Sequence, residues 1–311
     1  SRERMPPGQG APSSVTHQVV QTKNQAAPLP PTLLARHWLE GEWLNSDQGV
    51  ARHSPTRRQD TVTWVPVAEP SLVSRALASA GGAARAWGTT PVRVRAAWLS
   101  ALAESLRARG DALAGVMCRE QGTCRRRAEE DIRAASLLLG MLRHRLETSR
   151  GELLSGGASE REVLTRRRPR GTIGLVTDAI EPVSSMASTV ATALGCANTV
   201  LWMPPVEAAG TSTLLCELML AAGLPRDALT VLHGLDAERR QSSAETLAPR
   251  GAWLDAGRQS RPDSVNPTVV LADADLSLAV QDLVSSAFDL GGQGMDCCRL
   301  AIVDRALTTT L

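Results

Sequence analysis

Thiols are the side chains in this sequence with the widest range of possible chemistry, because a thiolate can bind a metal ion, form a disulfide or attack a carbonyl group. The chain has six of them, at Cys118, Cys124, Cys196, Cys216, Cys297 and Cys298. They show no C-x-x-C or mixed Cys/His spacing, which argues against a metal site. We therefore expect free thiols in a reducing compartment, and a cytoplasmic protein.

The bulk composition excludes several classes of function. The net charge of +2 indicates no particular polyanionic partner, and an aromatic content of 3% leaves no stacking surface for single-stranded nucleic acid. No apolar run reaches the ~18 residues of a membrane span, and the first residues lack the apolar core of a signal peptide. Since the sequence does not begin with Met, we expect a fragment of a longer chain.

The stretch from Gly171 to Pro205 predicts the element around which the rest is organised. Residues 173–176 form a short run without polar alternation, which is typical of a strand buried on both faces. Residues 183–194 have helical spacing, Gly195 suits a left-handed helix end, and residues 199–202 form a second β-rich run. This order predicts a βαβ unit with parallel strands and a right-handed crossover.

Further elements are expected on both sides of this unit. Residues 1–35 are rich in Pro, Gln, Ser and Gly and predict a flexible linker. A hairpin follows at 37–43. Helices are then expected over 71–87, over 92–109, after Asp111 as an N-terminal cap, and over 128–148. After the central unit we expect a helix over 211–222 and strands over 229–234, 251–254 and 268–272.

Several of these segments resemble the aldehyde dehydrogenase superfamily. Its pattern P-x-G-x-x-G-x-x-x-P-W-N-x-P, then A-L-A-x-G-N-T-V-x-x-K-P-S, is matched in its scaffold positions between Pro169 and Pro205. The most specific match is Ala222-Gly223-Leu224-Pro225 with the strand up to Gly234, which is similar to A-G-L-P-x-G-x-x-N-V-V-x-G. The resemblance covers about residues 37 to 305.

The resemblance implies a nucleophilic cysteine, which this chain does not have at the matching position. The family pattern F-x-x-x-G-Q-x-C falls on the segment from Phe288, and its Cys position is Met295. A thioether cannot form a thiolate. Cys297 and Cys298 come two and three residues later and could take the position only in a rebuilt loop, so we interpret the pattern as loss of the nucleophile.

The other functional positions of the family also differ. The Asn that would stabilise an oxyanion is Ile180, the Lys that would hold the cofactor ribose is Met203, and the general-base Glu is Asp255. Glu207 and Gly234 are the remaining candidates for a cofactor contact. The family's Gly-x-Thr-x-x-Gly turn is missing and no G-x-G-x-x-G occurs. The sequence therefore contains no recognisable motif that would bind a pyrophosphate through backbone N–H groups.

The sequence thus predicts an α/β fold with a Rossmann-like parallel sheet and flanking helices, as in the cofactor domain of aldehyde dehydrogenases. N-terminal helices precede this sheet and a truncated catalytic domain follows it. We expect a flexible Pro-rich linker over 1–35, a degenerate nucleotide-binding-type domain over 36–265 and the start of the catalytic-type domain over 266–311.

Two functions remain open at this point. The pattern looks most like the degenerate second module of the double-module family sixteen aldehyde dehydrogenases. That implies a non-catalytic pseudoenzyme with a structural, assembly or regulatory role, no bound cofactor and no metal. Its expected partner is a companion aldehyde dehydrogenase module or a second copy, with no nucleic acid and no membrane. The alternative is an NAD(P)-dependent oxidation of aldehydes to carboxylic acids, with Cys297 or Cys298 as a displaced nucleophile and Asp255 as base.

Overall fold

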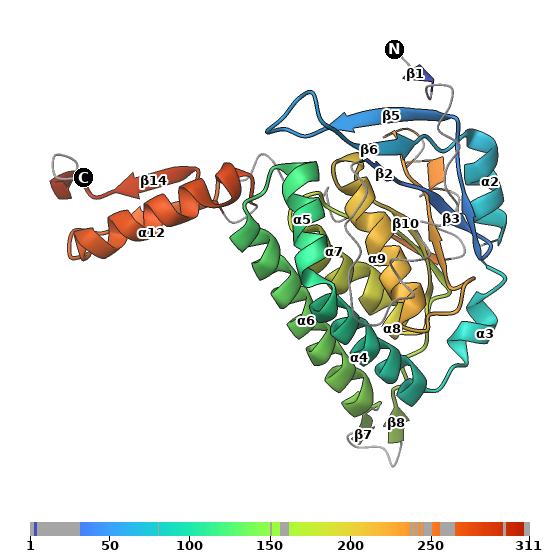
Figure 1. Ribbon diagram of the computed structural model, residues 1–311. Helices are drawn as coiled ribbons and strands as arrows, with labels where there is room; N and C mark the ends of the chain where they lie inside the picture. The colour runs from blue at the N-terminus through green and yellow to red at the C-terminus, as the bar shows by residue number, and fades with distance from the viewer. Residues whose placement is uncertain are drawn as a thin grey trace. The chain divides into compact units, whose positions relative to one another are not determined.

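The structure, a computed structural model, describes residues 3–4, 32–79, 81–149, 151–155, 162–236, 251–255, 265–294 and 297–307, with positions 238, 240, 242, 243 and 245. The chain divides into two compact units, Ser1–Ala256 and Gly257–Leu311, and each is described by itself (Figure 1). The domain limits expected at 35/36 and 265/266 stay a prediction.

A six-stranded sheet forms the centre of the first unit, in the order β12-β9-β10-β11-β3-β4. Its strands are β3 (His37–Leu39), β4 (Glu42–Leu44), β9 (Thr172–Val176), β10 (Thr199–Met203), β11 (Leu229–Val231) and β12 (Gly251–Asp255). The four strands from β9 to β12 are parallel, and the β3–β4 hairpin adds two antiparallel strands at the edge. The predicted βαβ unit and hairpin are confirmed.

Alternate residues of the buried strands enter two different apolar cores. On β10, Val200 and Trp202 belong to the large core, whereas Leu201 and Met203 belong to a smaller one on the opposite face. This alternation follows from the two-residue period of a strand, and it explains why both faces of β10 need apolar side chains.

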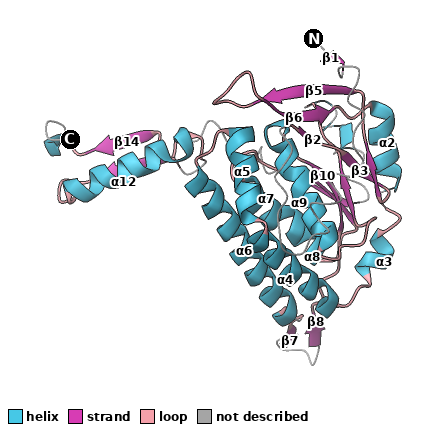
Figure 2. Ribbon diagram, in the orientation of Figure 1, coloured by secondary structure: helices cyan, strands magenta, loops and turns pink. Residues whose placement is uncertain are grey.

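Helices cover both faces of this sheet. The helices of unit 1 whose full lengths are described are α2 (Pro70–Ser79), α3 (Ala84–Gly88), α4 (Val92–Ala108), α5 (Gly110–Gln121), α6 (Arg125–Thr148), α7 (Pro182–Met186), α8 (Thr192–Gly195) and α9 (Ala209–Ala221), with the π-helical turn η1 (Ala187–Ala191) and the 3₁₀ turn η2 (Val206–Ala208). Figure 2 shows α4, α5, α6 and α9 together on one side of the central strands. Helix α2 packs on the other face through Val73 and Ala76. No described helix is both long enough and apolar enough to cross a membrane.

The flexible linker expected over 1–35 stays a prediction, although short strands lie near both of its ends. A second sheet, in the order β1-β5-β6-β2, contains β1 (Glu3–Arg4), β2 (Leu33–Leu34), β5 (Gln48–His53) and β6 (Thr61–Pro66). Two of these strands lie inside the predicted linker, and Leu33 is buried at 7% exposure. Residues 5–31 lie outside the described residues. A small hairpin, β7 (Leu153–Ser155) with β8 (Glu162–Leu164), follows α6.

Three local predictions about helix ends are corrected. The helix expected over 71–87 is two helices, because the chain leaves helical geometry at Gly81-Gly82. Asp111 does not cap α5, which begins at Gly110 without a side-chain cap. Gly195 is helical, and the left-handed residue is Ala197 with φ 67°. At Gly195 a Cβ atom would come within 3.2 Å of Leu146, so close packing accounts for this glycine.

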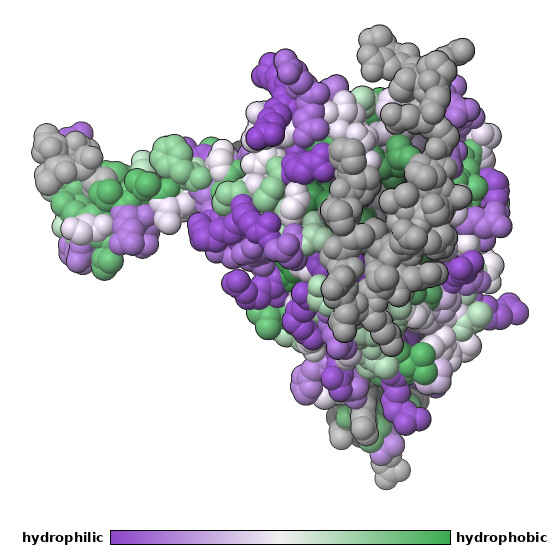
Figure 3. All heavy atoms as spheres, viewed as in Figure 1, coloured by the Kyte–Doolittle hydropathy of each residue, from purple (hydrophilic) through white to green (hydrophobic). Residues whose placement is uncertain are grey.

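In its described residues, the second unit contains a parallel pair of strands and one α-helix. They are β13 (Pro267–Val270), β14 (Leu300–Val303) and α12 (Leu276–Phe288), with the 3₁₀ turns η3 (Asp289–Gly292) and η4 (Arg305–Leu307). The carboxylate of Asp275 caps α12 by accepting from the N–H groups of Ser277 and Leu278. No residue of α12 is buried, and apolar side chains such as Phe288 are exposed. Figure 3 shows hydrophobic residues over much of the visible surface of this unit.

Candidate active site

The carboxyl ends of the parallel strands form one edge of the central sheet, which is where open α/β sheets bind ligands. Val176 at the end of β9 lies beside Met203 at the end of β10 and beside Asp255 at the end of β12. Ile180 follows β9 by four residues, and Gly234 follows β11 by three. The structure therefore brings the backbones at four of the predicted site positions to the same edge.

Ile180 lies in a loop with a well-defined backbone. Its N–H donates to the side chain of Asp178 at 3.0 Å, and the amide of Gln121 donates to the carbonyl of Ala179 at 2.5 Å. Glu181 takes a left-handed conformation, φ 51°, and α7 begins directly after it. The Ile180 side chain is half-buried and is a hydrocarbon, so it offers no hydrogen bond to an oxyanion.

A buried carboxylate holds the helix that follows this loop. Asp131 on α6 accepts from the N–H of Val183 at 3.0 Å and from the N–H of Ser184 at 2.8 Å. Its side chain is 3% exposed, and burial raises its pKa against the effect of these bonds. Sequence reasoning missed Asp131, because the capped helix lies 52 positions away and no local pattern links the two.

A second buried carboxylate holds the helix after β10. Glu120 on α5 accepts from the N–H groups of Gly210 and Thr211 at 2.7 and 2.9 Å, and from the hydroxyls of Thr211 and Thr63 at 2.8 and 2.9 Å. Burial raises the pKa of this carboxyl, and the hydrogen bonds oppose the rise. The site thus rests on two carboxylates that cap helix N-termini from other elements.

Met203 does not replace the family lysine in any polar role. It is 2% exposed and packs with Val176, Leu201 and Leu232 in the apolar core under α2. An NAD(P) ribose bound at this edge would therefore find no cation at position 203. Glu207 is exposed on η2, and a carboxylate there can accept hydrogen bonds from ribose hydroxyls. Of the two ribose contacts that the resemblance implies, the described residues lack the cation at position 203 and retain an acceptor at position 207.

Gly234 has a structural reason to be glycine. Its φ is 67°, and a Cβ atom there would lie 2.6 Å from the carbonyl oxygen of Pro66 and 2.8 Å from the Cα of Val67. Close approach of β6 explains this glycine without a phosphate. The Asp255 backbone ends β12, and its side chain lies outside the described residues. Residues 246–250 and 256–264 also lie outside them, so the structure does not test a nucleotide turn there.

The thiols of the second unit have different partners. Cys297 is 2% exposed and its Sγ lies 3.3 Å from the carbonyl oxygen of Asp289. Cys298 is 7% exposed and its Sγ lies 3.3 Å from the carbonyl oxygen of Leu300. A hydrogen bond with the Thr268 side chain lowers the pKa of Cys298. Met295 lies outside the described residues.

The backbone donors near these thiols are engaged. The N–H of Cys297 donates to the carbonyl of Gly294 at 3.3 Å, and the N–H of Cys298 donates to the hydroxyl of Ser286 at 3.0 Å. An oxyanion formed at either thiol would have to displace one of these acceptors to gain a backbone donor. Among the described residues no group of His, Cys, Asp and Glu is arranged to hold a metal ion.

Comparison with known proteins places these features in one family. The sequence model described as "Aldehyde dehydrogenase family" matches residues 43–246. The chain is 25% identical over 285 residues to a malonate-semialdehyde dehydrogenase of Halalkalibacterium halodurans, covering 86% of this chain and 58% of that protein. It is 28% identical over 283 residues to a 2-hydroxymuconic semialdehyde dehydrogenase of a Pseudomonas species, covering 83% and 58%. The chain thus spans 58% of the length of both relatives.

Solved structures share the fold. An NADP-dependent glyceraldehyde-3-phosphate dehydrogenase from Bacillus halodurans, complexed with NADP, superposes with a TM-score of 0.78 at 21% identity, covering 90% of this chain and 63% of that one. The predicted α/β fold of aldehyde dehydrogenase type is confirmed, and so is the superfamily resemblance. The family match covers more than half of the sequence and includes β9, β10 and β11 of the sheet edge described above. The chain belongs to the aldehyde dehydrogenase family.

Proposed function

We propose that this chain carries the cofactor-type domain and the start of the catalytic domain of a slow, NAD(P)-dependent aldehyde dehydrogenase, with Cys298 or Cys297 as nucleophile. One observation carries the proposal: residues 43–246 match the aldehyde dehydrogenase family, and the relatives described above are named as dehydrogenases. The choice of thiol follows from local chemistry, because a bond to Thr268 lowers the pKa of Cys298 whereas burial raises the pKa of Cys118, Cys196 and Cys216. A lower pKa increases the fraction of thiolate, the form that attacks a carbonyl carbon.

The relatives support the substrate class. Those described above are named as semialdehyde and glyceraldehyde-3-phosphate dehydrogenases, and the solved structure among them shares the fold. An aldehyde is therefore the substrate class that we propose here. NAD(P) would accept the hydride, as the name of the glyceraldehyde-3-phosphate dehydrogenase indicates for that protein.

The residues at the sheet edge set how slow this enzyme would be. Ile180 supplies no donor to an oxyanion, and removal of one such donor costs about 10²–10³ in kcat. Met203 supplies no cation to the nucleotide, and loss of one charged hydrogen bond weakens binding by about 1.5–3 kcal/mol, or roughly 10- to 100-fold. We therefore expect turnover well below that of the relatives and a nucleotide KM well above theirs.

Restoring the missing donor tests the proposal. Ile180→Asn places an amide on a loop whose backbone is already fixed by Asp178. We expect aldehyde-dependent NAD(P)H formation, measured by absorbance with propanal as substrate, to rise by about 10²-fold in this variant. Cys298→Ser or Cys297→Ser should abolish the signal, and the exposed Cys196→Ser is the matched control. No signal from the wild type and none from Ile180→Asn would overturn the proposal.

A non-catalytic module is the second candidate, favoured by the chemistry of Ile180 and Met203 together. Both positions carry hydrocarbon or thioether side chains where the reaction requires a donor and a cation. In this candidate the partner is a companion aldehyde dehydrogenase module or a second copy of the chain. Calorimetric titration with NAD⁺ and NADP⁺ separates the two functions, because the non-catalytic module should give no saturable heat. Sedimentation of the chain alone and with the companion module then identifies the partner.

A further inference from the structure

The outer side of α6 carries an apolar stripe that no described residue covers. Leu137, Leu138 and Met141 are 65%, 36% and 63% exposed, and Ala134 is exposed one turn earlier. These four positions recur at the i, i+3, i+4, i+7 spacing of a helix face. The inner side of the same helix is buried in the large core through Ile132, among others. Helix α6 is therefore apolar on two sides.

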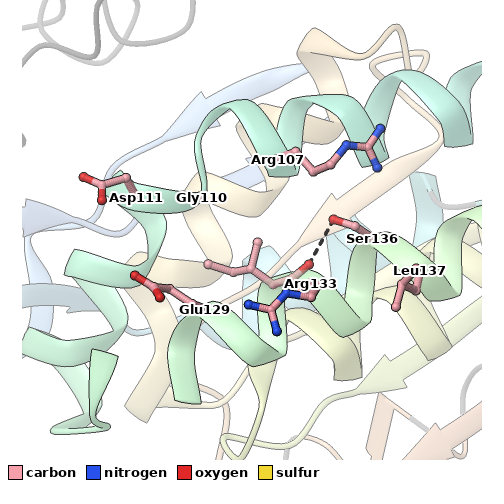
Figure 4. A pocket seen from close by; sticks show the side chains of 8 residues that line it. Arg107, Gly110, Asp111, Glu129, Arg133, Ser136 and Leu137 are labelled. Carbon is pink, nitrogen blue, oxygen red and sulfur yellow. Dashed lines mark hydrogen bonds between the residues drawn. The ribbon is translucent and has the colours of Figure 1, made fainter. Parts of the chain in front are cut away.

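A hollow lies next to this stripe, between α6 and the junction of α4 and α5. It has a volume of about 440 Å³, and its uncharged lining residues are Gly110, Ile132, Ser136 and Leu137. Figure 4 shows the hollow from close by. The hydroxyl of Ser136 already donates to the carbonyl of Ile132 at 2.9 Å, so these four residues offer a ligand little polar chemistry. We call the hollow and the stripe together the α6 groove.

The charged side chains that line the α6 groove are two acids, which are paired with Arg125, and two arginines. Its two acids, Asp111 and Glu129, are both paired with Arg125, at 2.9 Å in the case of Glu129. Its two cations, Arg107 and Arg133, have no ion pair within the described part of the chain. Figure 4 shows Arg107 and Arg133 on opposite sides of the hollow, one from α4 and one from α6. A ligand in the α6 groove would thus contact apolar residues between the side chains of Arg107 and Arg133, which have no ion pair among the described residues.

The length of the groove selects a helix over a small molecule. From Ile132 to Met141 the apolar surface runs for nine residue steps, or about 14 Å along α6. That length matches two to three turns of a second helix laid in a groove, with its own apolar residues at i, i+3, i+4 and i+7. A second copy of this chain presenting the same face would bring Arg107 and Arg133 against each other's like charges, which disfavours self-association here.

We propose that the α6 groove docks an amphipathic helix of net negative charge from another protein. Its apolar face would cover Leu137 and Met141, and acidic residues beside that face would pair with Arg107 and Arg133. The surface belongs to unit 1 alone and does not depend on whether the chain turns over aldehydes.

A pair of probe peptides tests the proposal on the full chain. The first is a blocked, fluorescently labelled peptide of about 18 residues, long enough for a helix, with a leucine stripe at i, i+3, i+4, i+7 flanked by glutamates. The second has lysines in place of the glutamates. Since each exposed charge pair contributes a few-fold, we expect the glutamate peptide to bind about tenfold more tightly in an anisotropy titration.

Charge reversal supplies the sharper outcome. The double variant Arg107→Glu, Arg133→Glu should invert the order of the two peptides, whereas Arg93→Glu, an exposed cation elsewhere on α4, should leave it unchanged. Leu137→Ala with Met141→Ala should weaken both peptides, and circular dichroism confirms that each variant is folded. Equal binding of the two peptides, binding of neither, or the same loss with Arg93→Glu would overturn the proposal.

Discussion

Glu217 provides the most informative test of how burial and charge balance in this fold. It lies on α9 at 6% exposure and accepts a bond from Arg36 at 3.1 Å through Oε1. Its other oxygen, Oε2, is buried and has no hydrogen-bond partner among the described residues. Burial is the largest influence and raises the pKa of Glu217 from 4.5 to about 7, although Arg36 opposes the rise.

This shift predicts a pH-dependent cost to stability. Between these two pKa values the folded protein retains a proton on Glu217 that the unfolded chain loses. The contribution of protonated Glu217 to the free energy of unfolding is therefore fully present below pH 4.5 and is lost as the pH rises through about 7. The difference between the two pKa values corresponds to roughly 3 kcal/mol in the free energy of unfolding. An amide at this position is neutral at every pH and has nearly the same shape.

Glu217→Gln should therefore be more stable than the wild type at pH 8, by up to about 3 kcal/mol, and should differ by less than about 1 kcal/mol at pH 5. Urea denaturation at both pH values measures the difference directly. Comparing the variant with the wild type at the same pH removes the effect of His37 and His233, whose pKa values are lowered by burial to about 4 and about 3. The contribution of these two neutral histidines to the free energy of unfolding is present above pH 6.5 and is lost as the pH falls.

The control is Glu104→Gln on the exposed face of α4, which should change the stability by less than about 0.5 kcal/mol at either pH. A variant Glu217→Gln that is less stable than the wild type at pH 8 would refute the reasoning. That outcome would mean that the ion pair with Arg36 outweighs the desolvation of the carboxylate.

Two further predictions concern the scaffold of the site. Asp131→Ala should destabilise the fold by about 2 kcal/mol or more, because it leaves the buried N–H groups of Val183 and Ser184 without acceptors, and calorimetric melting measures the loss. Leu139→Ala should cost about 2–5 kcal/mol in urea denaturation, because Leu139 is 0% exposed, while the neighbouring Leu138→Ala at 36% exposure should cost much less. Similar losses for the two leucines would contradict the assigned faces of α6.

The strands and helices of the central sheet could be predicted because their signals are local. The runs at 173–176 and 199–202 became β9 and β10 with ends shifted by a single residue. Helix α9 was expected over 211–222 and occupies Ala209–Ala221. A buried parallel strand needs apolar residues on both faces, and this requirement is visible in a short window of sequence.

Other features depended on contacts between distant segments and left no local signal. Leu33 pairs with Thr63 of β6, so a strand formed where composition indicated a linker. Gly195 is glycine because Leu146 approaches it, not because of its own backbone angle. In each case the decisive partner lies at least thirty positions away, beyond the reach of a pattern in neighbouring residues.

The candidate site shows the same division. The resemblance identified Ile180 and Met203 as departures from the residues of the family pattern. The structure adds that Ile180 is half-buried on a loop with a fixed backbone, while Met203 is buried in the core. Met203 could be predicted to lack a charge, but its packing against Leu232 could not. The family sixteen resemblance and the roles of Asp255, Cys297 and Cys298 stay predictions.

The two capping carboxylates give the rescue experiment its meaning. Glu120 and Asp131 hold the helices at the sheet edge through backbone N–H groups, and neither depends on the side chain at position 180. The loop backbone is fixed separately by Asp178 and Gln121. A substitution at Ile180 therefore changes a hydrogen-bond donor and leaves the supports of the loop in place. If the nucleophilic thiol and the nucleotide site are functional, the added amide should raise the rate of NAD(P)H formation. If they are not, the rate should stay unchanged, and the chain has retained only the scaffold of the site.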